Sequence, residues 1–275
     1  MEWSKIKNII LFILLAVNLI LLGMVSYQEY QSARYDTQTL ESAVTLLASN
    51  GISVEAELPE PSDLPVLQLE LAAPDGQRQE AQVEAVLGGV EDVTDSGGGT
   101  RLRYRGAWGD GELSPDGHFS FTLGEGALPA ETDREAQGSL LLAGLGMQVT
   151  LAGRSSQEGQ EVLTYWQVWN GVPVFTCQCT VTYQGDSVVA LSGRRIQGHT
   201  SAVSTQSALT VPTVLVRFLT GMTQNGYVCS TITAVTQGYS TALANNRLTP
   251  VWALETDTGR FYINAVTGAF SRAEE

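Results

Sequence analysis

The sequence predicts an α+β fold, in which an N-terminal transmembrane helix precedes an ectodomain of antiparallel sheets with helices packed on one face. Three observations carry this prediction. Residues 9–25 form an uncharged apolar run, and Asn170-Gly171 joins two stretches that read as strands. The second half of the chain also reads twice as a helix followed by three strands. Helices and antiparallel strands in this order are typical of the α+β class.

The apolar run Ile9–Val25 is long enough to form a membrane span. Its 17 residues would rise about 25 Å as a helix, which nearly spans a bilayer core. Lys5 and Lys7 precede the run, so the positive-inside rule places the N-terminus in the cytoplasm and the C-terminal domain outside. The run is longer than the apolar region of a cleaved signal peptide, and an anchor is therefore favoured over that alternative. We expect a single-pass cell-membrane protein with residues 1–28 as cytoplasmic tail and transmembrane helix.

Asn18 and Gly23 interrupt this run and are the candidate positions for contact with a partner's transmembrane helix. A polar side chain in mid-span is costly in lipid, and a hydrogen bond to a neighbouring helix is one way to offset the cost. The alternative is that Asn18 is tolerated in lipid without a partner. The residues alone leave both interpretations open.

The ectodomain is expected to contain two α+β subdomains, at residues 29–130 and 131–275. The boundary rests on composition, because glycine, alanine and proline replace the patterned residues over 124–132. The first ectodomain helix should end at Asn50-Gly51. Its apolar positions follow three-and-four spacing: Leu40, Ala43, Val44 and Leu47.

The clearest hairpin signal of the chain is Asn170-Gly171. A two-residue loop fixes the register of the two strands, and it would place Trp166 opposite Phe175, Val168 opposite Pro173, and Thr164 opposite Cys177. One face of the second strand is then apolar and buried: Phe175, Cys177, Cys179, Val181 and Tyr183.

A helix is also predicted to begin near Thr210 and to end at Asn225-Gly226. Pro212 is tolerable only in its first turn. One stripe of the helix is apolar: Val211, Val214, Leu215, Phe218, Leu219 and Met222.

Composition argues against one class of partner. The net charge is −14, and both lysines precede the apolar run. An acidic surface without a basic stripe repels phosphate backbones, so nucleic-acid binding is poorly supported.

Three cysteines in an exported chain do not make a disulfide framework. Cys177 and Cys179 share one face of a strand and cannot easily bond each other, although either could reach Cys229. Buried free thiols are the favoured interpretation, because free cysteine is among the most buried residue types.

No catalytic, metal or cofactor site can be assembled from spacing. Asp95-Ser96-Gly97 and Asp257-Thr258-Gly259 invite comparison with the paired carboxylates of aspartic proteases, but Asp-x-Gly is first of all turn chemistry. His118 and His199 are each alone in a polar context. Arg194-Arg195 could contact an anion or a partner, and a solvated strand end is the favoured account. We therefore expect a protein that is not an enzyme and uses no cofactor.

The opening MEWSKIKNIILFILLAVNLIL resembles the start of the YycI family of two-component system regulatory proteins. The phrases WQVWNGVPVF and LTPVWALETDTGRFYINAVTG are similar to the C-terminal strands of that family and, more loosely, to PepSY-type modules. Together these segments cover about a third of the chain.

The resemblance implies a non-enzymatic, membrane-anchored regulator of a sensor histidine kinase of the YycG/WalK type that controls cell-wall homeostasis. It also implies a YycH-like single-span protein as a second partner, with contacts through transmembrane helices and ectodomains. The alternative is a PepSY-like extracellular binding module that restrains an envelope protease or binds a wall component.

Overall fold

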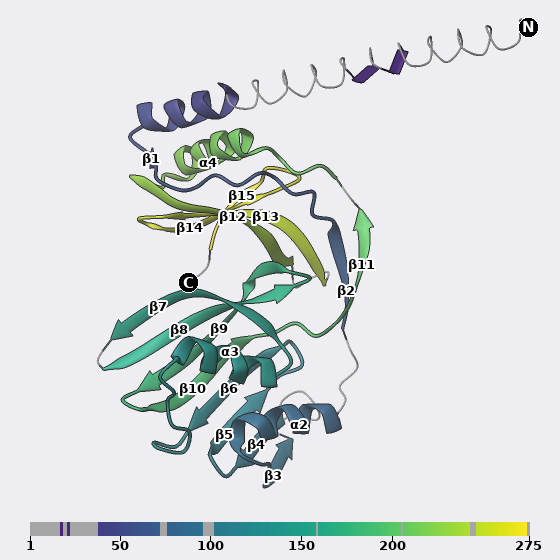
Figure 1. The fold of residues 1–275 in the computed structure, drawn as a ribbon, viewed down its shortest axis with the longest axis vertical. Coiled ribbons are helices and arrows are strands. Elements are labelled where there is room, and N and C mark those ends of the chain that lie inside the picture. Colours follow the sequence, from purple (N-terminus) through teal and green to yellow (C-terminus); the bar gives the residue numbers. More distant parts are fainter. Residues whose placement is uncertain are drawn as a thin grey trace, which may run out of the picture.

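A computed structural model of the chain describes residues 17–18, 21–22, 38–71, 76–95, 102–157, 159–204, 206–242 and 246–273. These residues form two units that share one sheet (Figure 1). The central unit comprises residues 76–194. The terminal unit is built from both sides of it, residues 38–71 and 198–273.

The central unit packs two helices against antiparallel strands. The helices are α2 (Gly76–Leu87) and α3 (Arg134–Gly144). Asp133 caps α3 by accepting a hydrogen bond from the Ala136 amide. The strands are β3 (Asp92–Asp95), β4 (Leu102–Gly106), β5 (Gly109–Leu113), β6 (His118–Leu123), β7 (Gln148–Gln157), β8 (Gln160–Trp169), β9 (Val172–Gln184) and β10 (Ser187–Arg194).

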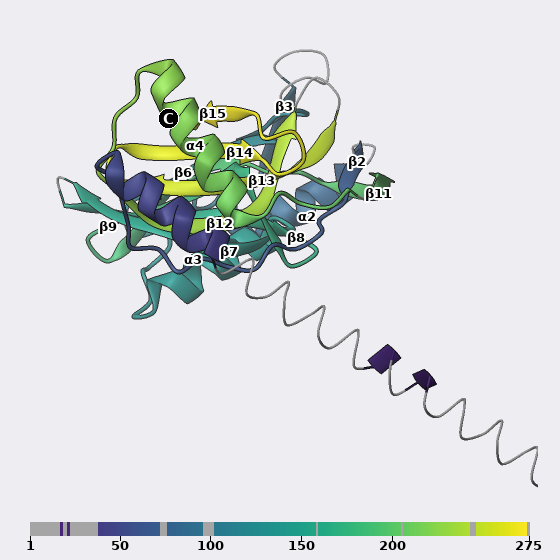
Figure 2. The ribbon, with the colours of Figure 1, turned by 90° about the horizontal axis from the view of Figure 1, so that it is seen from above.

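The terminal unit carries a helix at residues 38–49 and helix α4 (Val211–Asn225). Figure 2 shows the two helices side by side above the terminal strands. These strands are β1 (Ser53–Val54), β2 (Val66–Leu71), β11 (Gly198–Ser204), β12 (Thr231–Ala242), β13 (Arg247–Thr256), β14 (Gly259–Asn264) and β15 (Phe270–Arg272).

Both terminal helices follow their sequence patterns. Helix α4 begins after Thr210, carries Pro212 in its first turn and ends at Gly226, whose left-handed φ of 69° closes the helix. The helix at 38–49 ends before Asn50-Gly51, and Ala43 and Leu47 are buried against the same core as α4. These two predictions are confirmed.

One continuous path of strands links the units. In the described residues it runs β11-β2-β13-β12-β9-β10-β6-β5-β4-β3. The step between units is a short parallel contact of β12 with β9, in which Tyr239 lies opposite Val174. A second parallel contact joins β1 to β12.

The predicted fold class is wrong. The chain is mostly β-sheet, and its strands belong to one large mixed sheet instead of separate antiparallel sheets in an α+β arrangement. The cause is non-local pairing. Strand β2 lies between β11 and β13, which follow it in the sequence by more than a hundred residues. Local periodicity reveals strands but not such partners.

The predicted membrane localisation is also corrected. Within the ranges that the structure describes, every helix is too short or too polar to cross a membrane. That finding overturns the expectation of a single-pass membrane protein. The segment Ile9–Val25 itself lies outside the described residues except for Val17, Asn18, Leu21 and Leu22.

The segment at 124–132 lies between β6 and α3. Strand β6, which precedes it, pairs along its length with β10, which follows it. Residues on both sides of the segment therefore share one sheet.

The β8–β9 hairpin follows the predicted register only near its turn. Val168 lies opposite Pro173 as predicted, but Trp166 lies opposite Gln178 and Thr164 opposite Thr180. The predicted pairs with Phe175 and Cys177 are therefore wrong. Residues 175–177 bulge out of the β8 ladder, which moves all later pairs along β9.

The bulge has a partner in the terminal unit. The Thr176 hydroxyl accepts a hydrogen bond from the Thr241 amide at 2.9 Å, so β9 turns from β8 toward β12 at this point. The Phe175 ring packs directly against Gly238. A Cβ added at Gly238 would lie 2.6 Å from that ring. The glycine permits the close approach that joins the units.

The apolar face of strand β9 contributes side chains to three separate hydrophobic clusters. Cys179, Val181 and Tyr183 belong to the core of the central unit, Cys177 belongs to a cluster with Leu67 and Leu69, and Phe175 packs on Val251 and Tyr262. The predicted burial of this face is confirmed. Cys177, Cys179 and Cys229 are buried, and none forms a disulfide.

Candidate functional site

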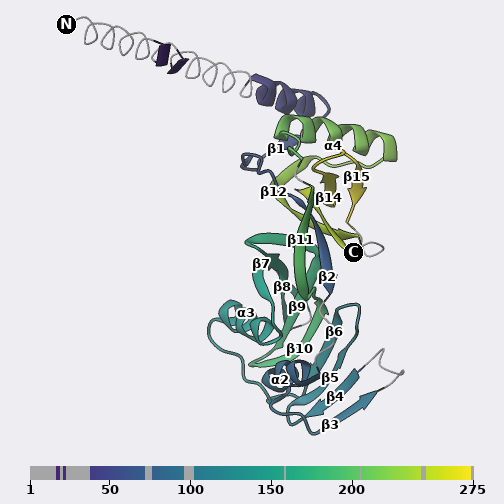
Figure 3. The same cartoon turned by 90° about the vertical axis from the view of Figure 1, so that its right-hand side faces the viewer.

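The ribbon formed by β2 and β11 lies along one side of the molecule and extends from the terminal unit toward the central unit (Figures 1 and 3). Its inner face is apolar. Leu67 and Leu69 are buried there against Tyr239 and Leu248. The ribbon is therefore part of the fold, and its outer edge is strand β11.

Strand β11 differs from the other edges of the sheet. In the described part of the chain β1, β3, β7 and β15 each pair with one strand, as β11 does. Strand β1 has two residues and β15 three, β3 carries two aspartates, and β7 carries an arginine and a bulge in mid-strand. Such charges, bulges and short lengths are the features that protect an edge from pairing. Strand β11 has seven residues, none charged, and its bulge lies at the far end, between Ala202 and Ser204.

The register shows which backbone groups of β11 face outward. Leu69 donates its amide to Asn246 on the β13 side, at 2.7 Å. In an antiparallel ladder the amide and carbonyl of one residue point to the same side. Leu69 therefore does not bond Thr200, which lies opposite it. The amide and carbonyl of Thr200 consequently point away from β2, toward the open edge.

The alternation extends this result along the strand. Gly198 and Ala202 share the orientation of Thr200, whereas His199 and Ser201 face β2. The open edge thus offers three residues with outward amide and carbonyl groups. This row of donors and acceptors is what an added strand pairs with.

Trp169 supports the inner side of the edge. Its indole Nε1 donates to the Thr200 hydroxyl at 3.1 Å, which sets the tip of the β8–β9 hairpin beside β11. Trp169 and Val172 are only partly buried in the cluster beneath the ribbon. Apolar side chains of an added strand could complete the cover of this cluster.

The chain that enters β11 is held firmly. Gln167, buried within β8, donates to the Ile196 carbonyl at 2.9 Å and accepts from the Ile196 amide at 2.8 Å. Nη1 of Arg195 donates hydrogen bonds to the Gln82 side-chain oxygen at 2.9 Å and to the Leu145 carbonyl at 2.5 Å. The start of β11 is therefore fixed to β8, α2 and the end of α3.

Arg195 corrects a sequence interpretation. A solvated strand end was expected for Arg194-Arg195, but Arg195 is only 5% exposed. Burial lowers the pKa of its guanidinium, which the nearby Tyr104 and Cys179 partly oppose. Arg195 therefore has a structural role. It donates to a carbonyl at the C-terminal end of α3, where the helix dipole favours a cation.

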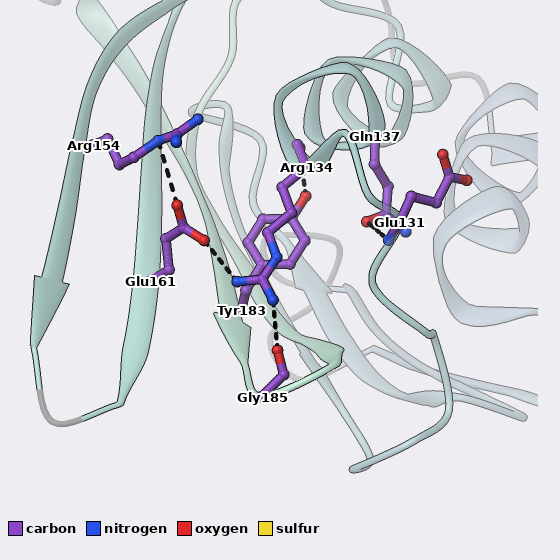
Figure 4. Close-up of polar contacts among 7 residues, drawn as sticks. All are labelled: Glu131, Arg134, Gln137, Arg154, Glu161, Tyr183 and Gly185. Carbon is purple, nitrogen blue, oxygen red and sulfur yellow. Dashed lines mark hydrogen bonds and ion pairs between the residues drawn. The ribbon is translucent and has the colours of Figure 1, made fainter.

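A second polar cluster lies at the start of α3 (Figure 4). Glu161 of β8 bridges two arginines, with Nη1 of Arg134 at 2.6 Å and Nε of Arg154 at 3.3 Å. Arg134 also donates to the Gly185 carbonyl at 2.7 Å, and Tyr183 donates its hydroxyl to the Arg134 carbonyl at 2.7 Å. These contacts secure α3 to the sheet and engage Arg154, the one charged side chain of β7.

The two Asp-x-Gly motifs are not brought together. Asp95 ends β3 in the central unit, whereas Asp257 lies in the β13–β14 turn of the terminal unit. Asp257 accepts hydrogen bonds from the Ser230 hydroxyl at 2.5 Å and from the Ser230 amide. These bonds lower the pKa of the Asp257 carboxyl. Turn chemistry accounts for the second motif.

The buried thiols and the remaining candidates give no chemical site in the described ranges. Burial raises the pKa of Cys177 to about 11 and that of Cys179 to about 12, so both are protonated at neutral pH. No group of metal-ligating side chains is found among the described residues. Asn18 is a helical, exposed residue, and Gly23 lies outside the described residues.

Sequence reasoning missed the β11 edge. The signal was present, since residues 198–204 contain no charge and include Thr200 and Val203, which favour strands. The pairing of β11 with β2, which makes it an edge, was not visible, because more than a hundred residues separate the two strands.

Comparisons with known proteins give little further guidance. No protein-family model matches the chain, and no curated protein sequence matches it. One similar solved structure is the Bacillus megaterium YpeB C-terminal domain, with 11% identity and a TM-score of 0.39. The match covers 75% of this chain and 100% of that domain. The resemblance to the YycI family rests on the sequence phrases.

Proposed function

We propose that this chain is a non-enzymatic binding module that takes up an extended polypeptide segment as an added strand beside β11. The observation that carries the proposal is the open, uncharged edge with outward backbone groups at Gly198, Thr200 and Ala202. Main-chain hydrogen bonds supply the affinity in such complexes, and alternate side chains supply the specificity.

The surroundings of the edge limit the chemistry of the segment. Side chains that fall on the inner face would meet Trp169, Val172 and Ala202, so small or branched apolar residues fit there. On the outer face they would lie beside His199 and Ser201, with Glu70 on the neighbouring strand. The chain carries a net charge of −14. A basic segment would be attracted, an acidic one repelled, and a neutral one neither.

This proposal keeps the binding-module alternative that the sequence suggested, without naming a protease or a wall component as the ligand. It needs no membrane anchor. The resemblance to the YycI family directs the choice of partners for the first experiments. Segments of a YycG/WalK-type sensor histidine kinase and of a YycH-like protein are therefore tested first. Regulation of such a kinase is a narrower proposal that the same experiment can support or refute.

The test uses two variants at one residue. Thr200→Pro removes an amide that points to the open edge, and proline is compatible with an edge position of this kind. Thr200→Val keeps the amide and the branched side chain and removes only the hydroxyl that binds Trp169. The two changes separate the backbone donor from the side chain.

Peptides would be selected from a random display library and from tiled segments of the two candidate partners, against the full chain. Their dissociation constants would then be measured by calorimetry. We expect Thr200→Pro to weaken binding by about fivefold or more, since one net hydrogen bond is worth about 1 kcal/mol. Thr200→Val should bind within about twofold of the unmodified chain. Equal binding by Thr200→Pro and the unmodified chain would refute strand addition at β11.

A further inference from the structure

The chain contains three Asn-Gly pairs, at Asn50, Asn170 and Asn225. Such pairs can deamidate without an enzyme, because the unhindered glycine amide nitrogen attacks the asparagine Cγ. A new N–C bond forms, ammonia leaves and a succinimide results. Water then opens the ring to aspartate or isoaspartate, so that water is the one co-reactant. The reaction needs both the glycine amide and the asparagine side chain to be free to move.

Two of the three pairs are held by hydrogen bonds at helix ends. Asn50 donates its side-chain amide to the Leu46 carbonyl at 2.8 Å, and the Gly51 amide donates to Ala48 at 3.0 Å. Asn225 donates in the same way to Gly221 at 2.8 Å, and the Gly226 amide donates to carbonyls of the last helical turn. Both reacting groups are therefore engaged in each pair.

Asn170 lies in a different setting. It forms the β8–β9 turn with Gly171, both residues are exposed, and both have positive φ, 50° and 83°. These angles fit a type I′ turn, in which the closing hydrogen bond joins the flanking residues Trp169 and Val172. The Asn170 side chain and the Gly171 amide are left out of that bond.

We propose that Asn170 is the deamidation site of this chain and that its product adds a carboxylate at the tip of the β8–β9 hairpin. Helix capping at the other two pairs slows the same chemistry there. The modified residue is the chain neighbour of Trp169, which is hydrogen-bonded to Thr200. The assignment of this site is argued from the turn geometry and does not depend on the function proposed for β11.

The test is incubation of the full chain in mildly alkaline buffer, followed by peptide mapping with mass spectrometry that resolves aspartate from isoaspartate. A parallel sample in denaturant serves as control. In the folded chain we expect Asn170 to react at least about tenfold faster than Asn50 and Asn225, because two hydrogen bonds must open at each capped pair. In denaturant the three pairs should react at similar rates.

A matched variant completes the experiment. Asn170→Gln should abolish the reaction at the hairpin, because glutamine closes the corresponding ring slowly. The midpoint of thermal unfolding should fall slightly, because the positive φ of residue 170 favours asparagine. Similar rates at the three pairs in the folded chain would overturn the proposal. So would a reaction at Asn50 or Asn225 that exceeds the reaction at Asn170.

Discussion

Strands β7 and β11 are both edges, yet they offer a partner very different surfaces. Strand β7 is longer, with ten residues against seven. Its ladder is interrupted between Leu151 and Gly153, and Arg154 projects beside the interruption with Glu161 as its ion-pair partner. Strand β11 is regular over Gly198–Ala202 and carries no charge. Charge and bulges protect an edge from pairing, so β11 is the better candidate acceptor although β7 is longer.

The largest expected effect tests what holds the β11 edge in place. Leu69 is 5% exposed beneath the ribbon, so Leu69→Ala should lower the free energy of unfolding by about 3 kcal/mol. Leu151 of β7 is only partly buried, and Leu151→Ala should cost about 1 kcal/mol. Urea titrations of the two variants measure the difference. A smaller loss for Leu69→Ala would contradict the view that a firm core supports the open edge.

A smaller effect is expected where the chain enters β11. Gln167→Ala removes both hydrogen bonds to Ile196 and leaves a buried amide and carbonyl without partners. We expect a loss of about 2 kcal/mol and faster hydrogen exchange at Ile196. Gln178→Ala on the exposed side of β9 is the control and should change stability by less than about 0.5 kcal/mol. If the two variants behave alike, the Gln167 contacts do not hold the strand.

The smallest expected effect is on the free energy of unfolding at alkaline pH, and it involves Tyr165 of β8, opposite Leu151 of β7. Burial raises the pKa of Tyr165 to about 12, with a further contribution from Glu135. The folded chain therefore holds this proton more tightly than the unfolded chain, whose tyrosine pKa is about 10. Stability from this group is complete below pH 10 and is lost as the pH rises toward 12. Tyr165→Phe should flatten this part of the pH profile. An unchanged profile would exclude Tyr165 as its source.

The parts of the fold that the sequence predicts are those set by neighbouring residues. Helix α4 has its proline, its apolar stripe and its Gly226 cap within one segment, and it was predicted correctly. The hairpin register is right at Val168 and Pro173, where the turn controls it. It fails at Trp166, because the Thr176 hydroxyl binds the Thr241 amide, 65 residues away. No local pattern contains that bond.

The same reason explains the errors in fold class and in the site. The mixed sheet depends on the contact of Tyr239 with Val174 and on the position of β2 between β11 and β13. The candidate edge depends on the same ribbon. Arg195 was expected at a solvated strand end, but its hydrogen-bond partners Gln82 and Leu145 are distant in the chain.

Hydrogen exchange at single amides tests the binding edge most directly. In the free chain the Thr200 amide should exchange quickly, because it faces the open edge, and the Ser201 amide should be protected by its bond to β2. Addition of a selected peptide should slow exchange at Thr200 and leave the amides of β7 unchanged. Nuclear magnetic resonance resolves these amides individually. Strong protection of Thr200 in the free chain, or fast exchange that a saturating peptide does not alter, would contradict strand addition at β11.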